Sequence, residues 1–275
     1  MLKNNYHTHM RFCNHAEGDV IDYVKMAVDL GFLELGMTDH GPIPTDFMNE
    51  VDYKRTYSYE NMKYETIGEY LAQIDDARDK YGDKIKIYSG FEVEYLYGHD
   101  EYYKDLRSKV DYLNLGIHFF EDDKGVLYDT YSDVTYKNLS YYVKTIIDAL
   151  NLGIYNTLVH PDLFMYGYKN VDGKREFDDA AIKASKEIIE ACIKNNVYVE
   201  INANGIKNDY DKPYKDFLYP YIDFWKIASN YKDLKIIVGA DSHKPSLLTG
   251  KHIKRVYEMI DLLSLNVLDR MEINH

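Results

Sequence analysis

The sequence predicts one α/β domain, residues 1–275, in which a parallel sheet closes into a barrel. Short runs rich in isoleucine, valine and leucine alternate with amphipathic helical patterns, as in sheets buried on both faces. The chain length of 275 residues is close to the roughly 250 of a closed α/β barrel. An open doubly wound sheet is the alternative, but no glycine-rich phosphate-binding motif follows the early strands.

The predicted strands are short and apolar, with polar or glycine-containing segments between them. We expect right-handed crossovers to join them, which places all their carboxyl ends on one face of the barrel. The six predicted strands are Leu33–Thr38, Ile85–Val93, Tyr112–Ile117, Thr157–Val159, Val197–Ile201 and Ile236–Gly239.

Three helices have the clearest sequence patterns. Asp19 is a suitable N-cap for a helix that follows it, and Gly31 is suited to end that helix. A second helix runs from about Asp178 to Lys194, with alanine, isoleucine and cysteine on one side. A third carries apolar residues from Ile253 to Leu263.

The composition indicates a globular protein and excludes several functional classes. Apolar residues make up 45% of the chain, which is enough for a sizeable core. The net charge of −13 disfavours nucleic-acid binding, because the phosphate backbone is itself negative. With two cysteines, no secretory signal and no long apolar window, we expect a cytoplasmic protein without a membrane partner.

Histidines gather at the carboxyl ends of the predicted strands, where barrel enzymes build their active sites. Seven of the ten histidines have this placement. In an extended segment His7 and His9 point the same way, so both reach one ion. Taken singly, such a histidine is more often a hydrogen-bonded core residue than a ligand. The seven are His7, His9, His15, His40, His118, His160 and His243.

Carboxylates accompany these histidines. Asp241 and His243 share one face after the last predicted strand, and Glu92 and Glu94 share a face at the end of another. The spacing does not choose between Glu92 and Glu94. Seven imidazoles with at least two carboxylates suit zinc, manganese or iron, and no thiolate cluster is present. Together they predict a metal site.

These motifs resemble those of the PHP (polymerase and histidinol phosphatase) superfamily, in the same order along the chain. The detail is most similar to its histidinol-phosphate phosphatase branch. Ala203-Asn204-Gly205 departs from the Thr-Ser-Gly that is frequent in that branch. The matching motifs are His7-Thr8-His9, Phe12-Cys13-Asn14-His15-Ala16, Thr38-Asp39-His40, Gly116-Ile117-His118-Phe119, His160-Pro161-Asp162, Glu200-Ile201-Asn202 and Asp241-Ser242-His243-Lys244-Pro245.

The resemblance implies a distorted seven-stranded (β/α) barrel, similar to a TIM barrel, that holds three divalent metal ions. It selects Glu92 over Glu94 by motif position. The implied ligands are His7, His9, Glu92 and Asp241 for the first ion, Glu92, His118 and His160 for the second, and His15, His40 and His243 for the third.

The resemblance also implies a phosphatase of histidine biosynthesis that converts L-histidinol phosphate to L-histidinol and phosphate. Three divalent ions and two carboxylates leave a local charge near +4, which attracts a small phosphate monoester to an acidic protein. The expected nucleophile is a hydroxide that bridges two ions. Glu92 and Asp241 are the expected catalytic residues, and Asp241 is the candidate for proton transfer.

Substrate contacts are less defined by the sequence. Arg11 is placed to bind phosphate oxygens, or else it is a solvated loop residue. Asp162 is placed to pair with a substrate amine, or else to orient a ligand histidine. We expect the polar loops Gly41–Glu60 and Glu121–Tyr136 to cover the site. The remaining histidines, His99, His252 and His275, are expected at the surface.

Three alternative functions stay open. One is a related phosphoesterase that acts on nucleotides or phosphotyrosine. Another is an amidohydrolase-like enzyme that cleaves C–N bonds; the set of His15, His40 and His243 counts against it, as does Glu92 where such enzymes often have a modified lysine. The third is a non-catalytic metal-binding module, but a degenerate site would have lost ligands. The sequence does not indicate the oligomeric state.

Overall fold

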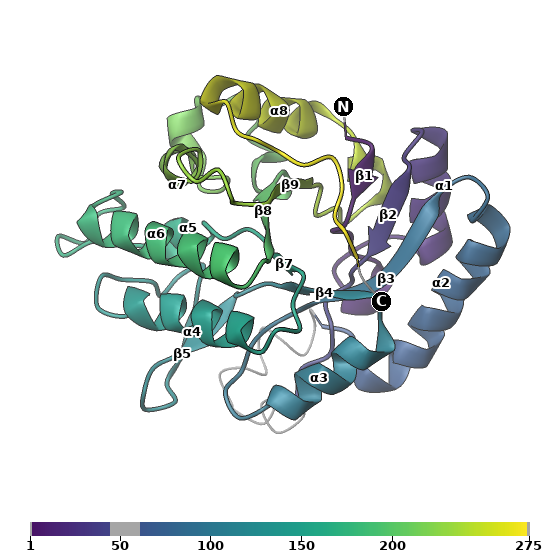
Figure 1. Ribbon diagram of the computed structural model, residues 1–275, viewed down its shortest axis with the longest axis horizontal. Coiled ribbons are helices and arrows are strands. Elements are labelled where there is room, and N and C mark those ends of the chain that lie inside the picture. Colours follow the sequence, from purple (N-terminus) through teal and green to yellow (C-terminus); the bar gives the residue numbers. More distant parts are fainter. Residues whose placement is uncertain (1, 45–60, 274–275) are drawn as a thin grey trace.

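Seven parallel strands form the centre of the protein in the computed structural model, which describes residues 2–44 and 61–273. They follow one another around the sheet in chain order (Figure 1). Parallel neighbours in chain order are the signature of an α/β barrel. The strands are β1 (Asn4–Asn5), β2 (Glu34–Met37), β3 (Lys86–Val93), β4 (Tyr112–Leu115), β7 (Thr157–Leu158), β8 (Tyr198–Asn202) and β9 (Ile236–Gly239).

The first and last strands meet, so the barrel is nearly closed. Beyond the ends of β1 and β9, Thr8 and Ser242 form a parallel bridge. The backbone N–H of His9 donates to the Ser242 carbonyl at 2.9 Å. Nearer the strands, the Ala240 N–H donates to Asn5 Oδ1 at 2.8 Å. The predicted seven-stranded distorted barrel in a single domain is therefore confirmed.

All six strands predicted from apolar runs are present, with shifts of a few residues at their ends. The additional strand, β1, was not predicted because it is only two residues long and both are asparagine. A hairpin of β5 (Phe119–Glu121) and β6 (Leu127–Asp129) was also not predicted. It occupies part of the segment 121–136, which was expected to be a loop.

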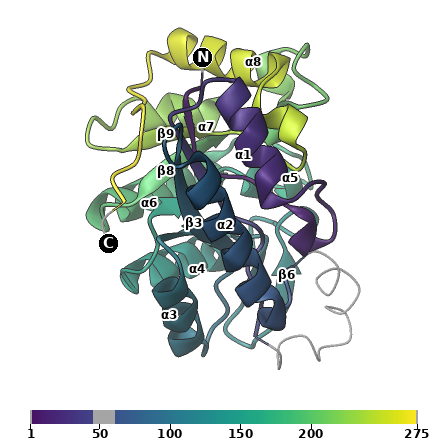
Figure 2. The same ribbon diagram turned by 90° about the vertical axis from the view of Figure 1, so that its right-hand side faces the viewer.

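Helices cover the outside of the barrel (Figures 1 and 2). Figure 2 shows α1 and α2 side by side outside the early strands. The helices that the sequence predicted correspond to α1, α6 and α8. The eight α-helices are α1 (Val20–Asp29), α2 (Ile67–Tyr81), α3 (Asp100–Lys109), α4 (Leu139–Asn151), α5 (Phe164–Gly167), α6 (Asp179–Lys194), α7 (Ile222–Ala228) and α8 (Lys251–Leu263) among the described residues.

The cap expected at Asp19 and the helix end expected at Gly31 are present, and α6 has a further cap at Asp178. The backbone N–H of Asp19 donates to Asp22 Oδ2 at 3.0 Å before α1. Gly31 follows the end of that helix with a left-handed φ of 71°. The side chain of Asp178 accepts hydrogen bonds from the backbone N–H groups of Ala180 and Ala181 at the start of α6. These contacts satisfy amides that have no partner inside the helix.

Tyrosines fill the end of the barrel where the strands begin. Tyr6, Tyr88, Tyr112 and Tyr198 form a buried cluster there with Met271. The Tyr112 hydroxyl donates to the Tyr6 carbonyl at 2.8 Å, which satisfies a buried polar group. Tyrosine side chains thus fill the barrel interior at this end, and the predicted site residues lie at the opposite end. None of the helices in the described ranges has the length and apolar character needed to cross a bilayer.

Candidate metal centre

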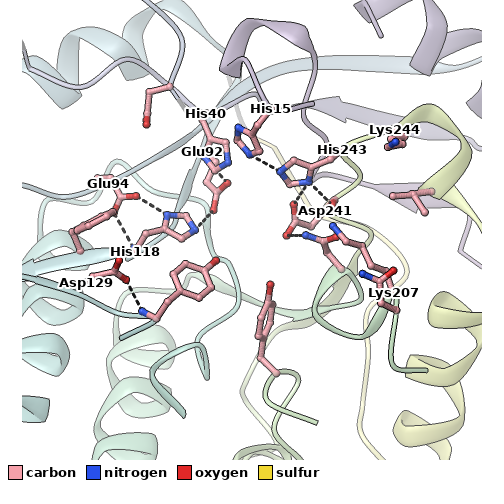
Figure 3. Close-up of a pocket in the computed structure, with 17 residues that line it drawn as sticks. His15, His40, Glu92, Glu94, His118, Asp129, Lys207, Asp241, His243 and Lys244 are labelled. Carbon is pink, nitrogen blue, oxygen red and sulfur yellow. Dashed lines mark hydrogen bonds and ion pairs between the residues drawn. The ribbon is translucent and has the colours of Figure 1, made fainter. Parts of the chain in front are cut away.

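The carboxyl ends of the strands bring the predicted histidines to one face of the barrel (Figure 3). The bridge between Thr8 and Ser242 aligns the segments after β1 and β9, and a bridge between His40 and Glu92 aligns those of β2 and β3. His7 and His9 lie on either side of Thr8 and are fully buried, whereas His15 is exposed at the mouth of the site. The cluster therefore extends from the barrel interior to its rim.

Glu92 lies at the centre of this cluster and is only 2% exposed. Its Oε1 lies 2.8 Å from His160 Nε2 and 3.6 Å from His118 Nε2. Its Oε2 lies 3.2 Å from both His7 Nε2 and His40 Nδ1. Burial alone would raise the pKa of Glu92, but the neighbouring His7, His40 and His118 hold this pKa well below its usual range. Glu92 is therefore an ionised carboxylate.

Two glycines make room for buried carboxylates. A Cβ atom at Gly116 would lie 2.2 Å from Glu92 Oε1, and a Cβ atom at Gly239 would lie 1.5 Å from Glu200 Oε1. Both distances are far inside van der Waals contact. Any larger residue at these strand ends would displace the carboxylate, so glycine is required there by close approach.

Asp241 has a fixed orientation at the end of β9. Its Oδ2 accepts hydrogen bonds from Asn202 Nδ2 at 3.0 Å and Asn204 Nδ2 at 3.1 Å. Its Oδ1 faces the cluster, 2.9 Å from His9 Nε2. Burial would raise the pKa of Asp241, but the nearby imidazoles, with His7 the strongest, hold it well below the usual range.

Asp241 and His160 also have left-handed backbones, with φ of 46° and 35°. Such conformations are rare for residues other than glycine and cost about 1–3 kcal/mol each. They persist where the surrounding structure holds a side chain in a particular place. Both residues point into the cluster, which is consistent with a functional requirement.

The outer ring nitrogens of four histidines are held by oxygen atoms. His7 Nδ1 lies 2.7 Å from Glu200 Oε1, and His118 Nδ1 lies 2.5 Å from Glu94 Oε1. His15 Nδ1 and His243 Nδ1 donate to the carbonyls of Cys13 and Asp241. A histidine held through Nδ1 presents its Nε2 lone pair on the other side, as metal-binding histidines do.

The inward nitrogens fit a cation. His15 Nε2 and His243 Nε2 lie 2.9 Å apart, and His7 Nε2 and His9 Nε2 lie 3.0 Å apart. Carbonyl oxygens only accept hydrogen bonds, so His15 and His243 carry their protons on Nδ1 when neutral. Their Nε2 lone pairs then face each other. This arrangement is favourable when a cation lies between the two nitrogens.

Several overlapping groups of side chains place their ligand atoms within 4.8 Å of one another. These groups share His9 and His40, so the geometry does not divide the histidines into the three separate sets expected from the resemblance. The imidazole and carboxylate donors suit zinc, manganese or iron. The groups are His9, His40 and His243; His7, His9 and Asp241; His40, Glu92 and His118; and His9, Cys13 and Asp39.

A cavity of about 660 Å³ opens above the cluster. Several histidines and both central carboxylates line it, so the candidate metal atoms are accessible to a small molecule. The expected loop 121–136 contributes Asp129 and Tyr131 to the lining, as anticipated. Most of the other expected covering loop, 41–60, lies outside the described residues.

Two candidate substrate residues do not line the cavity. The Arg11 guanidinium is engaged by Asp19 and Glu69 and lies 4.5 Å over the Phe12 ring. These carboxylates and the aromatic ring account for its position without a phosphate.

Asp162 is fully buried rather than in contact with the cavity. Its Oδ2 accepts hydrogen bonds from the Tyr221 backbone N–H and from Trp225 Nε1, so it fastens the start of α7. Burial raises the pKa of Asp162 to about 7.

Sequence reasoning also missed residues that complete the site. Glu200 and Asn202 were noted only as part of a motif, yet Glu200 Oε2 accepts a hydrogen bond from Asn202 Nδ2 at 3.0 Å beneath the cluster. Their position at the end of a predicted strand was the available signal. Lys207 and Tyr219, which line the cavity, lie in loops without such a signal.

His252 was expected at the surface, but it is buried in the structure. Its side chain is 4% exposed, and its Nε2 donates to the Leu247 carbonyl at 3.2 Å. Its position on the apolar side of α8, next to Ile253, explains this burial. His275 lies outside the described residues.

Comparisons with known proteins agree with this geometry. A family model described as the PHP domain matches residues 5–204. The histidinol-phosphatase of Bacillus subtilis is 24% identical over 270 residues, covering 89% of this chain and 94% of that protein. The histidinol phosphate phosphatase of Lactococcus lactis, solved in complex with zinc, L-histidinol and phosphate, has a similar fold, with a TM-score of 0.69 at 19% identity. That match covers 99% of this chain and 100% of the other.

Proposed function

The chain belongs to the PHP domain family, and from that premise we propose that it is a metal-dependent phosphomonoesterase that hydrolyses L-histidinol phosphate. The products are L-histidinol and phosphate. Relatives named as histidinol-phosphatases match most of this chain, which supports this substrate over nucleotides or phosphotyrosine.

The observation that carries the proposal is the set of ligand atoms around Glu92, at the floor of an accessible cavity. We propose nine residues as the ligands of up to three divalent ions: His7, His9, His15, His40, Glu92, His118, His160, Asp241 and His243. Seven of them belong to the groups whose ligand atoms lie within 4.8 Å of one another. His15 and His160 adjoin these groups through His243 and Glu92. Bound ions of this kind neutralise phosphoryl oxygens and lower the pKa of water, which is the chemistry that phosphoester hydrolysis needs.

The protein's own groups hold this arrangement in place. Glu200 and Glu94 orient His7 and His118 through their Nδ1 atoms, so these rings need no reorganisation during the reaction. Glu92 lies between the imidazoles with both carboxylate oxygens facing their ring nitrogens, so it can bind the same cations as they do. The buried tyrosines fill the barrel interior beneath the cluster, and the cavity lined by the candidate ligands opens at the other end.

We assign proton transfer to Asp241. Asn202 and Asn204 bind its Oδ2, which leaves Oδ1 facing the cluster, where it can exchange a proton with the nucleophile or the leaving alkoxide. Asp241→Asn should lower kcat by about 10²–10⁴-fold with a much smaller change in KM. Steady-state kinetics at saturating metal would measure both. An unchanged kcat would remove Asp241 from this role.

The substrate proposal is tested by phosphate release from L-histidinol phosphate, nucleoside monophosphates and phosphotyrosine, after incubation with zinc or manganese. We expect kcat/KM to be highest for L-histidinol phosphate. Activity confined to another ester would retain the phosphatase and replace its substrate. If metal binds but no ester is hydrolysed, the phosphatase proposal fails and C–N hydrolysis becomes the reaction to assay.

A further inference from the structure

The cavity above the candidate metal centre has walls of opposite charge. Figure 3 shows Asp129 on one side of the cavity and Lys207 on the other, with the histidines between and above them. Both residues line the same cavity. Neither belongs to the proposed ligand set, so their charges are available to a bound molecule.

Asp129 presents a carboxylate with no lysine or arginine partner among the described residues. It lies at the end of β6 and is half-buried, and its Oδ1 accepts a hydrogen bond from the Tyr131 N–H at 2.7 Å. Its Oδ2 has no hydrogen-bond partner within residues 2–44 and 61–273, and no described lysine or arginine lies within ion-pair distance. A partly desolvated carboxylate without a cation favours a positively charged ligand.

An aromatic surface adjoins this carboxylate. The Tyr131 ring is nearly parallel to the His118 ring, with an interplanar angle of 8° and centroids 6.0 Å apart. Tyr166 meets Tyr131 edge-on, with centroids 5.2 Å apart. Tyr219 lines the same cavity. Aromatic faces of this kind bind flat rings and organic cations.

The opposite wall carries the available positive charge. Lys207 follows the short 3₁₀ turn Asn204–Ile206 after β8, and no carboxylate of the described chain lies in ion-pair range of it. Lys244 also lines the cavity, but its Nζ is paired with Glu17 Oε1 at 2.6 Å. Of the two described lysines that line the cavity, Lys207 is therefore the one without a carboxylate partner, and it can contact a phosphate oxygen.

We propose that this cavity selects phosphate esters that also carry an ammonium group, with Asp129 Oδ2 as the ammonium-binding atom and Lys207 as a phosphate-binding residue. This inference rests on the proposed phosphatase function and names the feature of the substrate that the site recognises. An ester with a neutral or negative organic group leaves the Asp129 carboxylate unpaired, so it binds less well. Asp129 determines specificity and takes no part in the chemistry.

The test measures a ratio of kcat/KM values in metal-loaded enzyme. O-phosphoethanolamine carries an ammonium without a ring, p-nitrophenyl phosphate carries a ring without an ammonium, and L-histidinol phosphate carries both. Asp129→Asn should lower kcat/KM for the two ammonium esters, relative to p-nitrophenyl phosphate, by about tenfold or more, mainly through KM. Asp123→Asn removes an exposed charge from the same hairpin and should leave the ratio unchanged.

A second variant tests the opposite wall. Lys207→Met should lower kcat/KM for all three esters by a similar factor, because they share the phosphate. Lys212→Met, which removes an exposed lysine further along the same loop, is its control. Unequal losses, confined to the ammonium esters, would contradict the assignment of Lys207 to phosphate.

The outcomes separate this inference from the proposed function. Equal losses on all esters in Asp129→Asn, or no loss, would overturn ammonium recognition while leaving the phosphatase intact. If the wild type hydrolyses p-nitrophenyl phosphate but neither ammonium ester, the substrate proposal and this inference both fail. Thermal unfolding identifies a variant that has not folded. In that case Asp129→Glu, which keeps the charge but moves it by one methylene, should lower the same ratio.

Discussion

Glu92 lies on β3 and Glu94 directly follows this strand, yet the two carboxylates contact different nitrogens of the histidine cluster. Glu92 faces the inward nitrogens of several imidazoles, whereas Glu94 binds His118 through its outer nitrogen and its backbone N–H. Alternation along a strand puts both carboxylates on one face, so spacing alone gave no means of choosing between them. The histidines that each carboxylate contacts come from neighbouring strands, and these contacts distinguish Glu92 from Glu94.

This difference predicts unequal effects on metal binding. Glu94→Gln should weaken the affinity for zinc by about 10–100-fold, since it disturbs the orientation of one ligand. Glu92→Gln should do more, because it removes a carboxylate shared by several histidines. Competition with a chromogenic chelator would measure both variants. A larger loss in Glu94→Gln than in Glu92→Gln would reverse the two assignments.

His252 provides a prediction away from the metal centre. Burial, together with the nearby positive charge of Lys207, outweighs its hydrogen bond to Leu247 and lowers the pKa of His252 in the folded protein. The unfolded chain therefore binds a proton first as the pH falls, so stability is lost as the pH decreases below about 6.5. Between pH 7 and pH 5, Tm should fall more in the wild type than in His252→Gln. Equal slopes in calorimetry would contradict this.

At the scale of elements, loop residues that begin helices also fix neighbouring segments. Asp178 caps α6 through two backbone amides and accepts a hydrogen bond from the Tyr168 hydroxyl at 2.8 Å. The segment 168–178 is thereby fastened to the helix it precedes. Asp162 does the same for α7 through Tyr221 and Trp225. The sequence position of such an acidic residue therefore does not show whether its role is structural or catalytic.

The cap at Asp178 should contribute measurably to the free energy of unfolding. Asp178→Ala should lower the free energy of unfolding by about 1–2 kcal/mol, because two helix amides and a tyrosine hydroxyl lose their acceptor. Asp179→Ala, one residue into the helix and exposed, is the matched control and should change stability much less. Urea denaturation of the metal-loaded protein would compare them. Equal losses would show that charge, rather than capping, accounts for the effect.

At the scale of the whole molecule, buried carboxylates and imidazoles from most strands converge at one end of the barrel. Without cations their lone pairs and charges oppose one another, so bound metal should stabilise the fold. At a free concentration 100 times its Kd, one ion adds about 2.7 kcal/mol to the free energy of unfolding. Chelation should therefore lower Tm, and added zinc or manganese should restore it. Glu92→Gln should show a smaller shift, and a Tm indifferent to metal would contradict the proposed centre.

Much of this architecture could be predicted from the sequence because it depends on local patterns. Apolar runs identified six strands, and four of the seven site histidines, His40, His118, His160 and His243, follow the ends of these strands. His7, His9 and His15 were identified by their spacing and motif. The helix α2 carries the spacing Ile67, Tyr70, Ile74 and Ala77 and was within reach of the same reasoning. β1 was not, since Asn4–Asn5 has no apolar pattern.

The contacts that complete the site could not be predicted in this way. Glu200 contacts His7 from a strand that lies 193 positions later in the sequence. Arg11 seemed suited to phosphate by sequence position alone, but two carboxylates from other segments engage it. Pairings of this kind depend on which strands become neighbours, and no local pattern encodes that.

The meeting of the first and last strands has a consequence for synthesis. A chain leaves the ribosome from its amino end, so His7, His9 and His15 emerge long before Asp241 and His243. His15 and its partner His243 are separated by 228 positions. During translation His7 is exposed before Glu200, the residue that orients it, has been made. The full set of proposed ligands can come together only after β9 has been made and has joined β1.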